Sequence, residues 1–174
     1  MSVEIQRAVD RTPQPWKNGL GVQYEIMCDG SLPDDWTWRL STADITQDVP
    51  FSIFPGVNRE FCVADGNGVV LTINGVEHRC ERGSITKFRG DDEVYARLID
   101  GPMRALNLMV RDGAAPIHLC RKEMEGSLAI IAIGKMQVIE SDGKQFCLDV
   151  LDAVVIKNQK IPINSVCDQL IFVA

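Results

Sequence analysis

Apolar and polar residues alternate along most of the chain in short runs, and turn-forming residues separate the runs. The clearest pair of runs covers 69–73 and 76–81, which Asn74 and Gly75 join. Asn-Gly favours a two-residue turn between antiparallel strands because both residues tolerate positive φ. Apolar positions three and four residues apart, the signature of a helix, are almost absent. The pattern therefore predicts an all-β protein.

A second hairpin is predicted from runs 94–99 and 103–110, which Asp100-Gly101-Pro102 joins. Successive side chains of a strand point to opposite faces. One face of the second run is therefore expected to carry Leu106, Leu108 and Val110, and the other face Asn107, Met109 and Arg111.

A third block, from residue 128 to 157, again has strand patterns on both sides of a polar turn at 141–144. Like the block that begins at Gly68, it has a leading glycine, Gly134, and a turn at Asn-Gly or Asp-Gly. This weak internal repeat predicts two related β-units with a boundary near 113–116. A glycine-led strand followed by such a hairpin resembles the cupin barrel. The expected fold is a bicupin of two RmlC-like jelly rolls, an N-terminal barrel over 1–112 and a smaller barrel over 113–174.

Composition and charge narrow the function. The chain has 174 residues, 45% of them hydrophobic and 24% charged, with a net charge of -6 and no run of Lys or Arg. Nucleic acid is therefore not an expected partner, because it requires a basic face. The start of the chain has no signal-peptide pattern, and the longest apolar run, 128–133, is too short for a bilayer. We expect a cytoplasmic protein with no membrane partner, whose six widely spaced cysteines are free thiols.

Histidines are too few for a metal site. Cupins that perform chemistry usually hold a metal with a His-x-His pair, a carboxylate and a later histidine. The corresponding segment here, 54–60, has no histidine, and the chain has only His78 and His118. No metal and no cofactor are expected.

Four segments resemble, in the same order, the HutD/Ves family of bacterial proteins. They are PWKNGLGVQYEI from residue 15, WRLSTADI from 38, FSIFPGVNR from 51 and LNLMVR from 106. Beyond about residue 115 the resemblance is one of general character. It implies a metal-free bicupin with a polar pocket in the first barrel. For the HutD branch it also implies a role in histidine utilisation and a ligand such as N-formylglutamate.

The resemblance also implies which residues form the pocket. The motif positions in this chain are Trp16, Asn18, Gly19, Glu25, Arg39, Ser41, Arg59 and Asn107. Gln23 joins the expected ligand-binding set as a departure, because relatives mostly carry Thr there and a longer amide would reshape the pocket. Tyr24, where many relatives carry Arg, is a second departure and should face away from Gln23.

These residue types suit a carboxylate. Arg39 and Arg59 each offer a planar fork of donors, Ser41 shares the face of Arg39, and the amides of Asn18 and Asn107 suit a second polar group. Trp16 would supply an apolar wall. Structural alternatives stand beside these roles: Glu25 is a ready ion-pair partner for Arg39, Asn107 is equally suited to a hydrogen bond within the fold, and Trp36 and Trp38 fit the core.

No catalytic residue is assigned from the sequence. Ser41 has no histidine near it in the chain, and Glu25 with Asp44 is a weak acid–base pattern. The first hypothesis is therefore a binder of a small carboxylate metabolite that modulates amino-acid catabolism. The alternatives are a metal-independent isomerase, lyase or hydrolase that uses Glu25, and a protein-interaction module with a vestigial pocket. An exposed edge strand in either barrel would also suit a homodimer.

Overall fold

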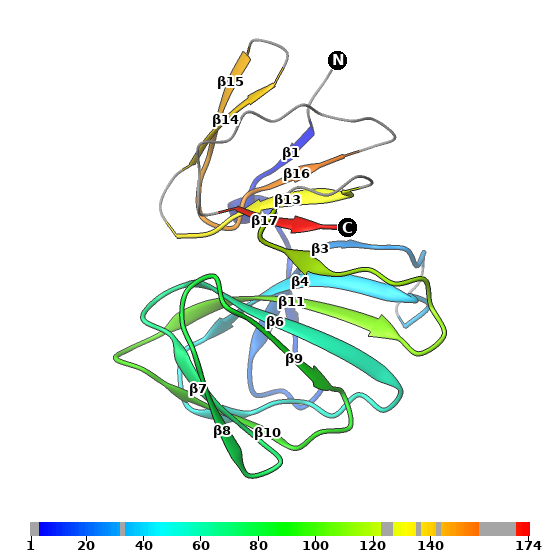
Figure 1. Cartoon of the computed structure of the whole chain (residues 1–174), viewed down its shortest axis with the longest axis vertical. Coiled ribbons are helices and arrows are strands. Elements are labelled where there is room, and N and C mark those ends of the chain that lie inside the picture. Colours follow the sequence, from blue (N-terminus) through cyan, green and yellow to red (C-terminus); the bar gives the residue numbers. More distant parts are fainter. Residues whose placement is uncertain (1–3, 32–33, 123–126, 135–136, 142–143, 157–169) are drawn as a thin grey trace.

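The computed structural model describes residues 4–31, 34–122, 127–134, 137–141, 144–156 and 170–174, and of 137–141 the backbone alone. The all-β prediction is confirmed: these residues form strands and one short 3₁₀ turn, η1 (Ala8–Asp10). None of them forms a helix with the length and apolar content that a membrane span requires. The strands gather into two units, one above the other in Figure 1.

The first unit consists of two sheets. The larger sheet has the order β2-β3-β4-β11-β6-β9 and the smaller the order β5-β10-β7-β8. The strands of the larger sheet are β2 (Pro13–Pro15), β3 (Val22–Cys28), β4 (Trp38–Ile45), β6 (Val57–Asp65), β9 (Ile85–Arg89) and β11 (Met103–Arg111). Those of the smaller sheet are β5 (Val49–Pro50), β7 (Val69–Ile73), β8 (Val76–Cys80) and β10 (Val94–Leu98).

The second unit has a five-stranded sheet of order β1-β16-β13-β17-β12 and a separate hairpin, β14-β15. The sheet consists of β1 (Glu4–Gln6), β12 (Leu119–Cys120), β13 (Ala129–Ala132), β16 (Ala153–Val155) and β17 (Leu170–Val173). The hairpin consists of β14 (Gln137–Ser141) and β15 (Lys144–Leu148). The turn residues Asp142 and Gly143, from which a turn was expected, lie outside the described residues.

The first predicted hairpin forms as expected. β7 pairs antiparallel with β8, and Asn74 and Gly75 between them have φ of 48° and 84°. Positive φ at both central residues is what a type I′ turn requires.

The second predicted hairpin is wrong in its pairing. The strands β10 and β11 exist, but β10 pairs with β5 and β7 while β11 pairs with β4 and β6. Both edges of β11 are therefore occupied within its own sheet. The turn at Asp100 and Gly101, with φ of 52° and 102°, carries the chain from one sheet to the other.

The chain begins in the second unit. β1 pairs with β16, with Glu4 opposite Val155, although the predicted boundary assigned these residues to the first barrel. Asp152 anchors the segment that follows: its carboxylate accepts hydrogen bonds from Arg7 Nη1 at 2.6 Å and from the Ala8 amide at 2.8 Å. The chain thus crosses from the second unit into the first before β2.

Strand alternation gives the larger sheet two different faces. On β11, Leu106 and Leu108 are fully buried against a core that includes residues of the second unit, such as Ile131 and Val173. The alternate positions, Asn107 and Met109, face the interior of the first barrel, as predicted. The shared core joins the units, and the opposite face of the same strands is left to line a cavity.

Glu60 reinforces this junction. Its buried carboxylate, on β6, accepts a hydrogen bond from the Leu119 amide at 2.7 Å and contacts His118 Nδ1 and Lys87 Nζ, each at 2.7 Å. Because Leu119 and His118 belong to the second unit, one carboxylate ties the two units together. His118 therefore lies at this junction of the two units.

Candidate functional site

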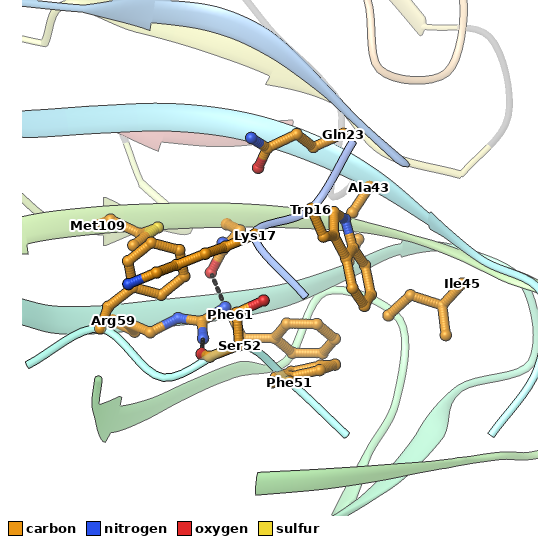
Figure 2. Close-up of a pocket in the computed structure, with 13 residues that line it drawn as sticks. Trp16, Lys17, Gln23, Ala43, Ile45, Phe51, Ser52, Arg59, Phe61 and Met109 are labelled. Atoms are coloured by element: carbon orange, nitrogen blue, oxygen red, sulfur yellow. Dashed lines mark hydrogen bonds between the residues drawn. The ribbon is translucent and has the colours of Figure 1, made fainter. Parts of the chain in front are cut away.

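A largely apolar cavity that contains the charged group of Arg59 lies inside the first barrel, against the inward face of β3, β4, β6 and β11 (Figure 2). It has a volume of about 40 Å³. It shares Lys17, Gln23 and Phe54 with a wider outer chamber of about 500 Å³. The walls of the inner cavity are Trp16, Lys17, Gln23, Ala43, Ile45, Phe51, Ser52, Phe54, Arg59, Phe61, Ala105, Asn107 and Met109.

Aromatic rings form the apolar wall of the inner cavity. Phe51 packs edge-on against Trp16, with ring centroids 6.0 Å apart, and tilted against Phe61 at 5.6 Å and Phe88 at 6.3 Å. Such edge and tilted contacts are the favoured geometries for aromatic pairs. The predicted role of Trp16 as an apolar wall agrees with this placement.

Arg59 is the charged group of the inner cavity. Its position on β6 points it into the barrel, where it is 7% exposed and lies over the rings of Phe51, Phe54 and Phe88 at 5.0–5.7 Å from their centroids. Its Nη1 donates to the Ser52 carbonyl and its Nη2 to Asn107 Oδ1, each at 3.3 Å. Its Nε has no hydrogen-bond partner.

The environment of Arg59 disfavours the charged form of its guanidinium. Burial lowers its pKa to about 10, and the neighbouring cation Arg39 acts in the same direction. Among the described residues no acidic side chain forms an ion pair with it. A buried charge is normally paired. An unpaired guanidinium that faces a cavity is therefore suited to an anionic ligand.

Asn107 and Gln23 place amides on either side of the cavity. Asn107, half-buried on β11, lines the cavity and accepts the hydrogen bond from Arg59, so the fold-internal hydrogen bond considered for it is present, and contact with a ligand stays a prediction. Gln23, on β3, lines the inner cavity and the outer chamber. Its Oε1 accepts from Arg39 Nη2 at 3.5 Å, and its amide leans over the cavity in Figure 2.

Arg39 lies in the outer chamber. Its guanidinium lies 5.2 Å from the centroid of the Trp36 ring. The guanidinium of Arg111 lies over the same ring, 4.5 Å from the centroid. Burial lowers the pKa of Arg39, while the charge of Glu25 raises it. Arg39 and Glu25 form no direct ion pair in the described residues: the Glu25 carboxylate instead accepts from the Cys28 thiol at 3.5 Å. Trp36 is buried as expected, and its Nε1 has no partner.

The turn from Trp16 to Gly21 closes the cavity. A Cβ on Gly21 would lie 2.7 Å from the Trp16 ring, so the glycine permits the ring to fold over the backbone. Asn18 holds the turn in place rather than lining the cavity: its Nδ2 donates to the Pro50 carbonyl at 3.1 Å, and its Oδ1 accepts from the Leu20 amide at 3.1 Å.

Glu25 and Ser41 lie near the cavity without lining it. They face each other across β3 and β4, and Ser41 also faces Asn107 across β4 and β11. Ser41 is fully buried in the sheet. Of the eight residues predicted for the ligand site, the structure thus brings Trp16, Gln23, Arg59 and Asn107 to the inner cavity and Arg39 to the outer chamber.

Sequence reasoning missed part of the wall, namely Lys17, Ser52 and the phenylalanines. Lys17 is exposed, lines both cavities, and has its Nζ 5.5 Å from the Phe54 ring centroid. The segment 51–54 was already part of a recognised motif. Alternation along β6 places Phe61 on the same face as Arg59, a signal that could have identified it, whereas Phe51 lies outside the strands, where no periodicity specifies its direction.

No three His, Cys, Asp or Glu side chains within the described ranges are arranged to hold a metal ion. His78 is exposed on β8, and the His118 ring contacts the Glu60 carboxylate at the junction of the units.

Two β-sandwich units in tandem, the first of them with a cavity in its barrel, define a bicupin. The chain belongs to the HutD family, whose model matches residues 8–170. It aligns with HutD from Pseudomonas fluorescens SBW25 with a TM-score of 0.77 and 27% identity, over 99% of this chain and 97% of that one.

Two curated relatives match over a shorter stretch. Protein Ves of Citrobacter koseri is 39% identical over 55% of this chain and 51% of its own length. An uncharacterized 21.2 kDa protein in the hutC 3′ region of Pseudomonas putida is 37% identical over 62% of this chain and 57% of its own length. The chain thus spans little more than half the length of these relatives.

Proposed function

We propose that this HutD-family bicupin binds a small carboxylate metabolite in its first barrel, with a carboxylate group against Arg59. The observation that carries the proposal is the buried, acid-free guanidinium at the inner end of a cavity. Planar N–H forks recognise carboxylates through two parallel hydrogen bonds. The unpartnered Nε of Arg59 is a donor that such a ligand would satisfy.

The size of the two spaces supports a particular orientation. The inner cavity of about 40 Å³ holds about three water-sized groups, because each needs roughly 10–15 Å³. That is room for a carboxylate or formyl group and not for a ring. The remainder of the ligand would occupy the outer chamber, where Arg39 and Lys17 are close to a second polar or acidic group.

The family name and a solved relative support the choice of probes. The HutD structure from Pseudomonas fluorescens belongs to a formate condition, and formate is the smallest carboxylate. The link of the HutD branch to histidine utilisation points to N-formylglutamate, which carries a formyl group and two carboxylates. On this proposal the protein senses or buffers such a metabolite and so modulates histidine or amino-acid catabolism.

Isothermal titration and thermal unfolding with formate, N-formylglutamate, urocanate and glutamate test the proposal. A ligand at 100 times its Kd adds about 2.7 kcal/mol to the free energy of unfolding, which is a readable shift. Stabilisation by a carboxylate, with no conversion of it seen by NMR, supports a binding function. Conversion of the ligand would instead support a metal-independent enzyme.

A matched pair of arginine variants locates the binding. Arg59→Met removes the guanidinium from the cavity, and Arg97→Gln removes one that pairs with Glu77 on the exterior at 3.1 Å. The proposal requires carboxylate binding to be lost in the first variant and kept in the second. Equal affinity in both variants would contradict it.

A further inference from the structure

A second cavity, of about 300 Å³, lies on the opposite face of the same strands, between the two units. On β3 it is lined by Tyr24, the neighbour of Gln23, and on β4 by Thr42 and Asp44, the neighbours of Ala43. Alternation along the strands therefore gives one sheet a cavity on each face. The remaining walls are Ala8, Val9, Arg11, Arg104 and Leu151, the last from the second unit.

Arg11 is a cation that forms no ion pair with any acid in the described part of the chain. Its Nε and Nη1 are shielded from solvent and have no hydrogen-bond partner, and its Nη2 reaches only the Gln6 carbonyl at 3.5 Å. Burial lowers its pKa, and the charge of Asp152, a carboxylate already paired with Arg7, offsets that effect only in part. The fold has removed water from this guanidinium without supplying acceptors, which is costly unless a ligand supplies them.

Asp44 is the complementary group on the other wall. Its carboxylate forms no ion pair in the described part of the chain and accepts one hydrogen bond, from the neutral Tyr24 hydroxyl at 3.2 Å. The second cation of the cavity, Arg104, is already paired with Asp65 at 2.7 Å. What remains is one unpaired positive and one unpaired negative side chain that share a cavity and do not contact each other.

Apolar side chains complete the walls. Val9 is 91% exposed at the edge of the cavity, and Ala8 and Leu151 belong to the same lining. A cavity with one free cation, one free anion and an apolar flank matches a small zwitterion that has an apolar side chain. A simple anion would be repelled by Asp44, and a simple cation by Arg11.

We propose that this inter-unit cavity binds an α-amino acid. The α-carboxylate lies against Arg11, the α-ammonium against Asp44, and the side chain against Ala8, Val9 and Leu151. The site is separate from the carboxylate site of the first barrel and does not depend on its proposed function.

Functional-group deletion on the ligand tests the proposal on the unaltered protein. L-Alanine, L-leucine, L-phenylalanine and L-glutamine are titrated calorimetrically at up to about 10 mM, which nearly saturates a site with a Kd near 1 mM. L-Leucine is then compared with 4-methylpentanoate, which lacks the amino group, and with 3-methylbutylamine, which lacks the carboxylate. We expect each analogue to bind at least about tenfold more weakly than leucine, because each leaves one wall charge unpaired.

Variants then assign the walls. Arg11→Gln and Asp44→Asn are expected to weaken leucine binding at least about tenfold, while Arg97→Gln, which removes an exterior arginine paired with Glu77, leaves it within about twofold. Thermal unfolding verifies that each variant is folded. The proposal is overturned if none of the four amino acids binds, or if 4-methylpentanoate binds as tightly as leucine. Carboxylate binding in the first barrel is measured separately with formate, so the failure of either site leaves the other result intact.

Discussion

Replacement of Arg59 by methionine tests whether this arginine binds a ligand or only supports the fold. Methionine keeps an unbranched chain that can pack on the rings of Phe51 and Phe88, and it removes the guanidinium. The variant also loses two hydrogen bonds, to the Ser52 carbonyl and to Asn107 Oδ1. The free energy of unfolding therefore changes by the balance between the removed charge and the lost bonds.

The size of this balance follows from the environment of Arg59. A pKa lowered from 12.5 to about 10 means that burial costs the charged form about 3 kcal/mol, at about 1.36 kcal/mol for each pH unit. At pH 7 the folded and unfolded chains are both protonated at this group, so the whole cost is present. It declines as the pH rises above about 10, where the folded state loses its proton while the unfolded state keeps it. Two hydrogen bonds from a charged donor stabilise by about 1.5 kcal/mol each, which nearly offsets the cost.

We therefore expect the free energy of unfolding of Arg59→Met to lie within about 1.5 kcal/mol of that of the unaltered protein. We expect the variant to bind a carboxylate about 100-fold more weakly. Urea unfolding at pH 7 measures the first quantity and titration with the best carboxylate probe measures the second. An arginine held in a buried ion pair would cost 3–5 kcal/mol on removal. A loss of stability of that size with unchanged affinity would refute the reasoning.

Three further changes test other parts of the structure. Gly21→Ala forces a Cβ to within 2.7 Å of the Trp16 ring, so we expect a Tm lower by about 2–8 °C and altered tryptophan fluorescence; an unchanged spectrum would show that the ring is not held there. Glu60→Gln replaces one of the two acceptor oxygens by an NH2 donor that faces donors from both units, and it should cost about 2 kcal/mol in urea unfolding; a cost below about 0.5 kcal/mol would mean that the units do not depend on it. Burial raises the pKa of Cys62 to about 12, so roughly one thiol in ten thousand is ionised at pH 8. DTNB should then modify the exposed Cys147 in the folded protein and Cys62 only after unfolding, and mass spectrometry of folded, treated protein checks this.

Local sequence patterns were sufficient to predict where the strands lie. They were not sufficient to predict which distant strands pair with each other. Asn74-Gly75 specifies its hairpin because both residues accept the turn's positive φ. Asp100-Gly101 has similar turn chemistry, yet the strands on its two sides join opposite sheets. The same limit applies to β1: nothing in residues 4–6 marks β16, about 150 positions away in the chain, as their partner. Register between distant strands depends on which apolar faces meet, and that information is spread over the whole chain.

The candidate site was predictable where a side chain's direction follows from alternation. Arg59, Asn107 and Gln23 lie on strand positions that face the barrel, and all three line the inner cavity. Asn18 lies in a turn, where no periodicity specifies direction, and its amide is used to hold that turn. Lys17, in the same turn, reaches the cavity for reasons of tertiary packing that its neighbours in sequence do not reveal.

Arg59, Arg39 and Arg11, whose pKa values are lowered by burial, identify where local energetics and function diverge. Elsewhere in the described residues exposed arginines are paired, as Arg89 is with Asp112 at 2.6 Å and Arg104 with Asp65 at 2.7 Å. Arg59, Arg39 and Arg11 are more deeply buried than these, so the lack of a direct ion pair costs them more, and each lines a cavity. A sequence selected for stability alone would have replaced such groups with apolar residues. Their retention is most simply explained if ligands supply the missing acceptors, with the first two facing the barrel interior and the third facing the junction between the units.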